Sequence, residues 1–137
     1  MPTQQEEVPL STAGQEKIYF DTLMRGNLFR VFGERDRGRR RAALDELYAT
    51  DATLYEPEGV FTGRDAINGA VDALISSLPP EFVFTPVGNA VGHHGVGRLT
   101  WRAGPPGGPA AVTGTDVARV EAGRIKSLHV FLDPEPR

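Results

Sequence analysis

Two acidic residues in apolar surroundings are the best candidates for chemistry in this chain of 137 residues. Asp116 lies in the segment AAVTGTDVARV, whose alternation places it on the same strand face as Gly114 and Ala118. Because a carboxylate on an apolar face is costly unless it is paired or protonated, we expect Asp116 to line a cavity. The alternative is the opposite register, which would leave Asp116 in solvent.

Glu56 is the second candidate, in the segment LYEPEG. This segment also fits an ordinary surface turn, and Glu58 competes with Glu56 for any role. If Glu56 points inward, it and Asp116 share one apolar environment, in which one carboxyl group is ionised and the other protonated. Such a pair can act as general base and general acid, and the expected reaction is proton abstraction next to a carbonyl group.

The three histidines do not suggest a metal site. His93 and His94 fall in a Gly-His-His-Gly turn, while His129 shares a strand face with Ser127 and Phe131, where a dimer contact is expected. No acidic residues stand at metal-ligand spacing from them, and the chain has no cysteine, so no metal is predicted. The glycines of GNAVGHHGVG match no phosphate-binding pattern, so no cofactor is predicted either.

Composition excludes several other classes of protein. A formal charge of −3 does not provide the basic field that a nucleic-acid backbone requires, so no nucleic-acid partner is expected. No apolar stretch approaches the roughly 18 residues of a membrane span, and the first residues lack the pattern of a signal peptide. We therefore expect no membrane association and a cytoplasmic location.

The elements that must position these residues follow from the apolar pattern. Residues 1–12 show no periodicity and are predicted to be a disordered tail, which leaves a single domain over 13–137. Helical spacing predicts helices over 16–33, 39–49 and 64–78, and two short strands joined by a turn fit 51–63. The arginines Arg37, Arg39, Arg40 and Arg41 are interpreted as a solvated helix start.

The remainder of the chain alternates as four sequential antiparallel strands, over 81–92, 95–103, 110–120 and 124–132. Three helices, a short hairpin and a four-strand meander predict an α+β fold whose helices cover one face of the sheet. The other face is then free to form a homodimer interface, through the strands that carry Arg119, His129 and Phe131.

This order of elements, with the segments ELYATDATLYEPEG, FTGRDAI and GTDVARVEAGRIKSLHVFLD, resembles the nuclear transport factor two-like superfamily. More narrowly, it resembles SnoaL-like polyketide cyclases and ketosteroid isomerases over about residues 16–133. The resemblance implies a cone, in which a strongly curved, mainly antiparallel sheet wraps around the helices and encloses an apolar cavity. The same cone hosts isomerases, cyclases and non-catalytic binders, so the fold alone does not choose a function.

The resemblance also implies roles for particular residues. Glu56, just before Pro57, matches the general base of the ketosteroid isomerases, and Asp116 in Asp-Val-Ala-Arg matches their second carboxyl group, the oxyanion partner. Leu28 stands near the position of the isomerases' tyrosine, so that phenol is missing. The residues expected to bind the substrate are Tyr55, Phe84, Leu99, Trp101, Leu128, Leu132 and Leu28.

The sequence thus supports two hypotheses of different kinds. The first is a small cofactor-free enzyme, of the isomerase or cyclase type, that uses acid–base chemistry on an apolar carbonyl compound. The second is a non-catalytic module of the same fold, which binds a hydrophobic ligand or associates with another protein.

Overall fold

The structure, a computed structural model, describes residues 12–134. Most of the predicted tail therefore lies outside the described residues, although Thr12 already belongs to the first helix. The helices are α1 (Thr12–Asn27), α2 (Arg37–Leu47) and α3 (Arg64–Ser76), and α1 continues into a π-helical turn, η1 (Leu28–Phe32). Among the described residues, no helix is long and apolar enough to cross a membrane.

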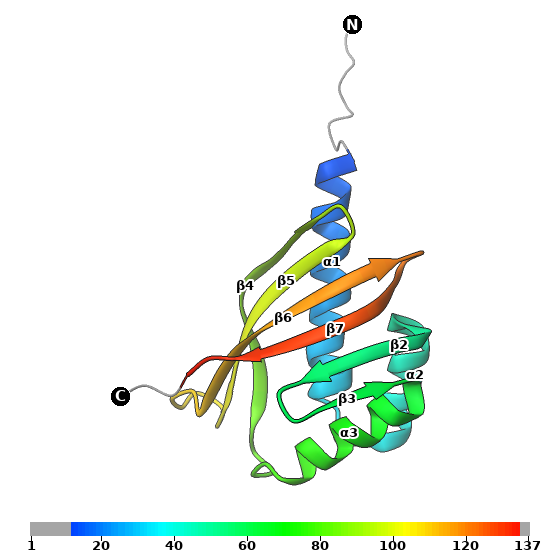
Figure 1. The fold of residues 1–137 in the computed structure, drawn as a ribbon. Coiled ribbons are helices and arrows are strands. Elements are labelled where there is room, and N and C mark those ends of the chain that lie inside the picture. Colours follow the sequence, from blue (N-terminus) through cyan, green and yellow to red (C-terminus); the bar gives the residue numbers. More distant parts are fainter. Residues whose placement is uncertain (1–11, 135–137) are drawn as a thin grey trace, which may run out of the picture.

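Six strands form one sheet in the order β3-β2-β7-β6-β5-β4. Their bounds are β2 (Tyr48–Glu56), β3 (Gly59–Thr62), β4 (Val83–His93), β5 (Val96–Gly104), β6 (Val112–Glu121) and β7 (Arg124–Leu132). Neighbouring strands are antiparallel except β2 and β7, which run parallel. The sheet curls and carries the helices on one side (Figure 1), which confirms the predicted α+β class and mainly antiparallel sheet.

Helix α1 packs closely against β4 and β5. The buried ring of Phe20 fits where Gly92 and Gly97 leave space, and a Cβ atom at Gly97 would lie only 2.4 Å from that ring. On the same helix, the Asp21 carboxylate accepts a hydrogen bond of 2.8 Å from the backbone N–H of Ala90. This N–H lies within the bulge of β4, so the contact ties the bend in that strand to α1.

One prediction about α2 is wrong: Arg40 is fully buried rather than solvated. Its guanidinium donates to Asn68 Oδ1 at 2.9 Å, to Asp72 Oδ1 at 3.1 Å and to the carbonyl oxygen of Glu34 at 3.0 Å. Arg40 therefore fastens α2 to α3. A run of arginines in the sequence does not reveal which of them meets acceptors that come about 30 residues later in the chain.

Tyr48 also differs from expectation, because it begins β2 instead of completing the second helix. Arg64 Nη2 donates to the Tyr48 carbonyl oxygen at 2.6 Å, and the buried Tyr48 hydroxyl donates to Asn27 Oδ1. These contacts hold the extended backbone at Tyr48. They also fix the start of β2, the strand that ends at Glu56.

Candidate functional site

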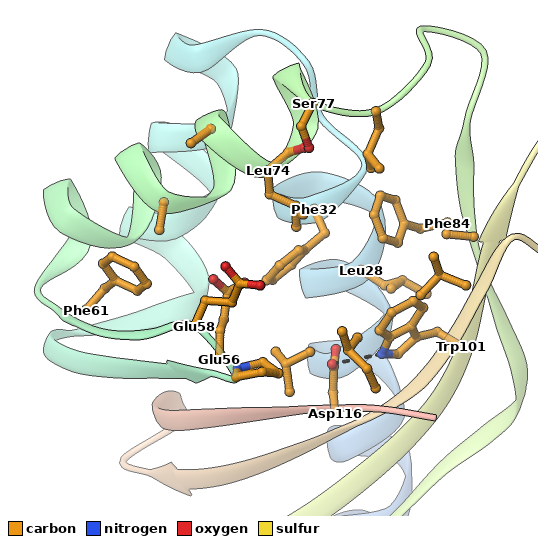
Figure 2. Close-up of a pocket in the computed structure, with 18 of the residues that line it drawn as sticks. Leu28, Phe32, Glu56, Glu58, Phe61, Leu74, Ser77, Phe84, Trp101 and Asp116 are labelled. Carbon is orange, nitrogen blue, oxygen red and sulfur yellow. Dashed lines mark hydrogen bonds between the residues drawn. The ribbon is translucent and has the colours of Figure 1, made fainter. Parts of the chain in front are cut away.

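A cavity of about 760 Å³ lies between α3 and the concave face of the sheet (Figure 2). Its walls are mostly apolar, and its acidic residues are Glu56, Glu58 and Asp116. The lining residues are Leu28, Phe32, Glu56, Pro57, Glu58, Phe61, Ala66, Gly69, Ala70, Ala73, Leu74, Ser77, Leu78, Phe82, Phe84, Trp101, Ala103, Val112, Asp116, Val130 and Leu132.

The cavity owes its volume to small side chains on α3. One face of this helix, at intervals of three and four residues, carries Ala66, Gly69, Ala70 and Ala73. Another face carries Ile67, Val71 and Ile75, which are buried in the core. The helix is therefore anchored by large residues, whereas its small residues face the sheet without filling the space.

Asp116 is positioned by the pairing of β5 and β6. Only 3 % of its surface is exposed, and its Oδ1 accepts a hydrogen bond of 2.9 Å from Trp101 Nε1. Gly114 lies opposite Trp101, and a Cβ atom at Gly114 would come within 2.6 Å of the indole ring. The glycine therefore makes room for the indole that holds Asp116, two residues further along β6.

The environment raises the pKa of both predicted carboxyl groups. Burial raises the pKa of Asp116 to about 7, with a further contribution from the charge of Glu56, and the Trp101 hydrogen bond only partly offsets this. For the half-buried Glu56, burial and then the charge of Glu58 raise the pKa. Near neutral pH, Asp116 is divided between acid and carboxylate, which is the state that proton transfer requires.

The structure brings most of the predicted site residues together. Glu56 and Asp116 line the same cavity, as do Leu28, Phe84, Trp101 and Leu132. Figure 2 shows Glu56 and Glu58 on one side of the space, and Asp116 and Trp101 on another.

Three of the predicted substrate-binding residues do not line the cavity. Tyr55 is on the opposite face of β2 from Glu56, where its ring stacks on that of His129 at a centroid distance of 4.2 Å. Leu99 and Leu128 lie within the core and have no exposed surface. Strand alternation places Tyr55 and Glu56 on opposite faces of β2. For Leu99 and Leu128, an apolar side chain on the inner face of the sheet fits the core and the cavity wall equally well, so the sequence did not distinguish the two.

Sequence reasoning missed the contribution of α3 and β3. Phe61 and the small residues of α3 line the cavity, and Glu58, treated as a competitor of Glu56, lines it as well. The sequence did contain a pattern that predicts a cavity beside this helix: small residues recur at helical spacing over 66–73, where a closely packed helix would have large side chains. Among residues 12–134, no group of three or more His, Asp or Glu side chains is arranged to hold a metal ion.

Comparisons with known proteins agree with this geometry. The sequence profile of the SnoaL-like domain matches residues 27–128. A structure from Agrobacterium tumefaciens, provisionally named an isomerase of the SnoaL-like family, is 27% identical and covers 85% of this chain and 99% of its own, with a TM-score of 0.78. No curated protein shows significant similarity to the chain.

Two more distant structures share the fold. One, from Kribbella flavida, is provisionally named a ketosteroid isomerase; it is 14% identical and covers 89% of this chain and 83% of its own, with a TM-score of 0.65. The other, from Sinorhizobium meliloti, is provisionally named a polyketide cyclase; it is 21% identical and covers 80% of this chain and 93% of its own, with a TM-score of 0.61. At these identities the likeness extends to the fold alone.

Proposed function

Since the chain belongs to the SnoaL-like domain family, we propose that it is a small enzyme of the isomerase or cyclase type. Its substrate is an apolar small molecule that contains a carbonyl group, and the chemistry is acid–base catalysis by the protein's own side chains. The observation that carries this proposal is that Glu56 and Asp116 line one apolar cavity, each with a raised pKa.

In the proposed reaction, the Glu56 carboxylate removes a proton from the carbon next to the substrate carbonyl. Negative charge then develops on the carbonyl oxygen, where the protonated form of Asp116 donates a hydrogen bond. The enolate accepts the proton back from Glu56 at a different carbon, which completes an isomerisation without net change in atoms. Trp101 supports this arrangement, because its indole N–H holds one oxygen of Asp116 and leaves the other for the substrate.

The walls contribute by excluding water and holding the substrate. Phe84 and Trp101 pack against each other at a ring distance of 5.7 Å, and Phe32 contacts Phe84 from η1 at 6.3 Å. A low-dielectric site strengthens the hydrogen bond from Asp116 to a developing oxyanion. The same apolar walls account for the preference for an apolar substrate skeleton.

The test is isomerisation of a simple β,γ-unsaturated ketone by the wild type, Glu56→Gln and Asp116→Asn. Glu56→Gln removes the base, and Asp116→Asn replaces the acidic hydrogen-bond donor with a weaker amide donor, both at nearly constant shape. Turnover is expected to fall at least a hundredfold in both. Glu81→Gln, the same change at an exposed residue outside the cavity, is the control and keeps full activity. Turnover within tenfold of wild type in both cavity variants contradicts the proposal.

A non-catalytic ligand-binding module is the second candidate. It is favoured by Leu28 and Phe32, which line the cavity from the helical side without offering any hydrogen-bond donor to an oxyanion. In that case the wild type binds apolar ligands but gives no turnover with any β,γ-unsaturated ketone. Ligands that co-purify with the protein would then identify its natural cargo.

A second copy of this chain is the partner that we propose for the outer face of the sheet. There Tyr55, His129 and Phe131 form a row of stacked rings, with His129 and Phe131 at a centroid distance of 6.2 Å. Phe131 is 55 % exposed and Val60, opposite Tyr55 in the sheet, is 61 % exposed. Covering such side chains with the same face of another copy removes apolar surface from water.

Light scattering at micromolar concentration tests this association. The wild type is expected to have the mass of a dimer, and Phe131→Lys that of a monomer. Phe29→Lys changes a similarly exposed phenylalanine on η1 and is expected to remain dimeric. A monomeric wild type would refute the proposed interface.

A further inference from the structure

The cavity is acidic as well as apolar. Three of its lining residues carry carboxyl groups, and among the described lining residues there is no lysine, arginine or histidine. Among the described side chains, which begin at Tyr19, none forms a hydrogen bond or ion pair with the side chain of Glu56 or Glu58. The three carboxyl groups therefore line one space whose described walls supply no cationic side chain.

This pattern contrasts with the acids elsewhere on the molecule. Among the described side chains outside the cavity, eight carboxylates each lie within 4 Å of an arginine or lysine nitrogen. They are Asp21, Glu34, Asp45, Glu46, Asp51, Asp65, Asp72 and Glu121. Most of the described acids outside the cavity thus have a cationic partner, whereas none of the three that line it has one. The charge of Glu58 raises the cost of ionising Glu56, and the charge of Glu56 raises that of Asp116.

The unpaired carboxyl groups are accompanied by aromatic rings. In Figure 2 the side chains of Glu56 and Glu58 project toward the space between Phe61 and Phe32. Further along the cavity lies Trp101, which donates a hydrogen bond to Asp116, and Phe84 packs against the Trp101 ring. The face of an aromatic ring attracts a cation, most strongly where water is excluded. Carboxylates and rings together therefore favour a positively charged group and disfavour an anion.

We propose that the cavity selects lipophilic amines, whose protonated nitrogen lies at the Glu58 side of the cavity while the apolar skeleton fills the space toward Trp101. The inference rests on the proposed function for the location of the substrate, and it specifies the substrate as an apolar carbonyl compound that bears a basic nitrogen. Glu58 is the anchor, because it is exposed at the rim and leaves Glu56 free to act as the base. Carboxylates and phosphate esters are excluded by repulsion.

The experiment uses three ligands with one skeleton and different charges: 1-adamantanamine, 1-adamantanol and 1-adamantanecarboxylate. Trp101 is the only tryptophan of the chain and lines the cavity, so its fluorescence reports binding directly. At pH 8 and low salt, the amine is expected to bind at least tenfold more tightly than the alcohol. The carboxylate is expected to bind at least tenfold more weakly than the alcohol.

Two variants locate the anchor. Glu58→Gln is expected to reduce the preference for the amine over the alcohol at least fivefold, while binding of the alcohol itself is unchanged. Glu81→Gln, an exposed residue next to the cavity wall, is expected to keep the wild-type preference. A thermal melting temperature equal to that of the wild type shows that each variant folds.

The proposal is overturned if none of the three compounds binds, if the carboxylate binds as tightly as the amine, or if Glu58→Gln retains the full preference. These readouts are independent of turnover. An amine preference without catalysis refutes the proposed enzyme and leaves the ligand class standing. Catalysis on neutral ketones without a preference for the amine refutes the proposed ligand class and leaves the proposed enzyme standing.

Discussion

The concave face of the sheet is used in two different ways. Beneath α1, the Phe20 ring fills the space that Gly92 and Gly97 provide, and the two layers are in close contact. Beneath α3, small residues on the helix meet the sheet across a cavity of about 760 Å³. In the half beneath α1, glycines on the sheet admit a large helix residue; in the half beneath α3, small helix residues leave a cavity. The position of the small residues therefore decides whether the two layers pack closely or enclose a space.

The half of the sheet that packs against α1, here called the packed half, should lose more stability than the half beneath α3, the open half, when volume is added. Gly97→Ala places a methyl group 2.4 Å from the Phe20 ring, which is buried and has little freedom to move. We expect a loss of about 3 kcal/mol in the free energy of unfolding, measured by urea denaturation. A loss below about 1 kcal/mol would show that this half is more loosely packed than we describe.

The open half instead contains a group whose ionisation opposes folding. Because the pKa of Asp116 is raised from 3.8 to about 7, the folded state holds a proton that the unfolded state releases. The contribution of Asp116 is fully favourable below about pH 4 and is lost as the pH rises through 7.

Asp116→Asn, which mimics the protonated acid, is therefore expected to be about 2 kcal/mol more stable than the wild type at pH 8. The difference should shrink toward pH 4, and urea denaturation at several pH values measures it. A variant that is equally destabilised at pH 4 and pH 8 would show that Asp116 is an ordinary structural carboxylate.

A larger side chain in the cavity should weaken ligand binding without lowering the stability of the fold. Ala70→Leu extends a side chain from α3 into the space, and we expect binding of 1-adamantanol to weaken at least tenfold, as read by Trp101 fluorescence. The free energy of unfolding should change by less than about 1 kcal/mol, because the added atoms extend into the cavity rather than into the packed core. Unchanged binding would place the ligand elsewhere.

The smallest expected effect comes from a glycine-to-alanine substitution in the half beneath α3, the counterpart of Gly97→Ala beneath α1. A Cβ atom at Gly69 has no neighbour within 4 Å, so Gly69→Ala adds no clash and removes a poor helix former from α3. We expect a gain of about 0.5–1 kcal/mol in the free energy of unfolding. A loss at Gly69 as large as that at Gly97 would erase the distinction between the two halves.

The sequence predicted local structure better than the cavity. Alternation around Asp116 placed it correctly on the buried face of β6, where Gly114 and Ala118 are buried beside it. The burial of Arg40 and the place of Tyr48 at the start of β2 depend on partners distant in the chain, which no local pattern specifies. Likewise, Leu99 and Trp101 lie on the same strand face, yet only Trp101 reaches the cavity, because α3 lies over one part of the sheet and not the other.

The most direct test of this account is the ionisation of Asp116 itself. The side-chain carboxyl signal of Asp116, labelled with ¹³C and identified by its absence in Asp116→Asn, can be followed by NMR from pH 3 to pH 9. We predict that it titrates with a pKa of about 7, as expected for a buried acid in an apolar cavity. A midpoint near 4, the ordinary value of an aspartate, would contradict the assignment of Asp116 as the acid of this site.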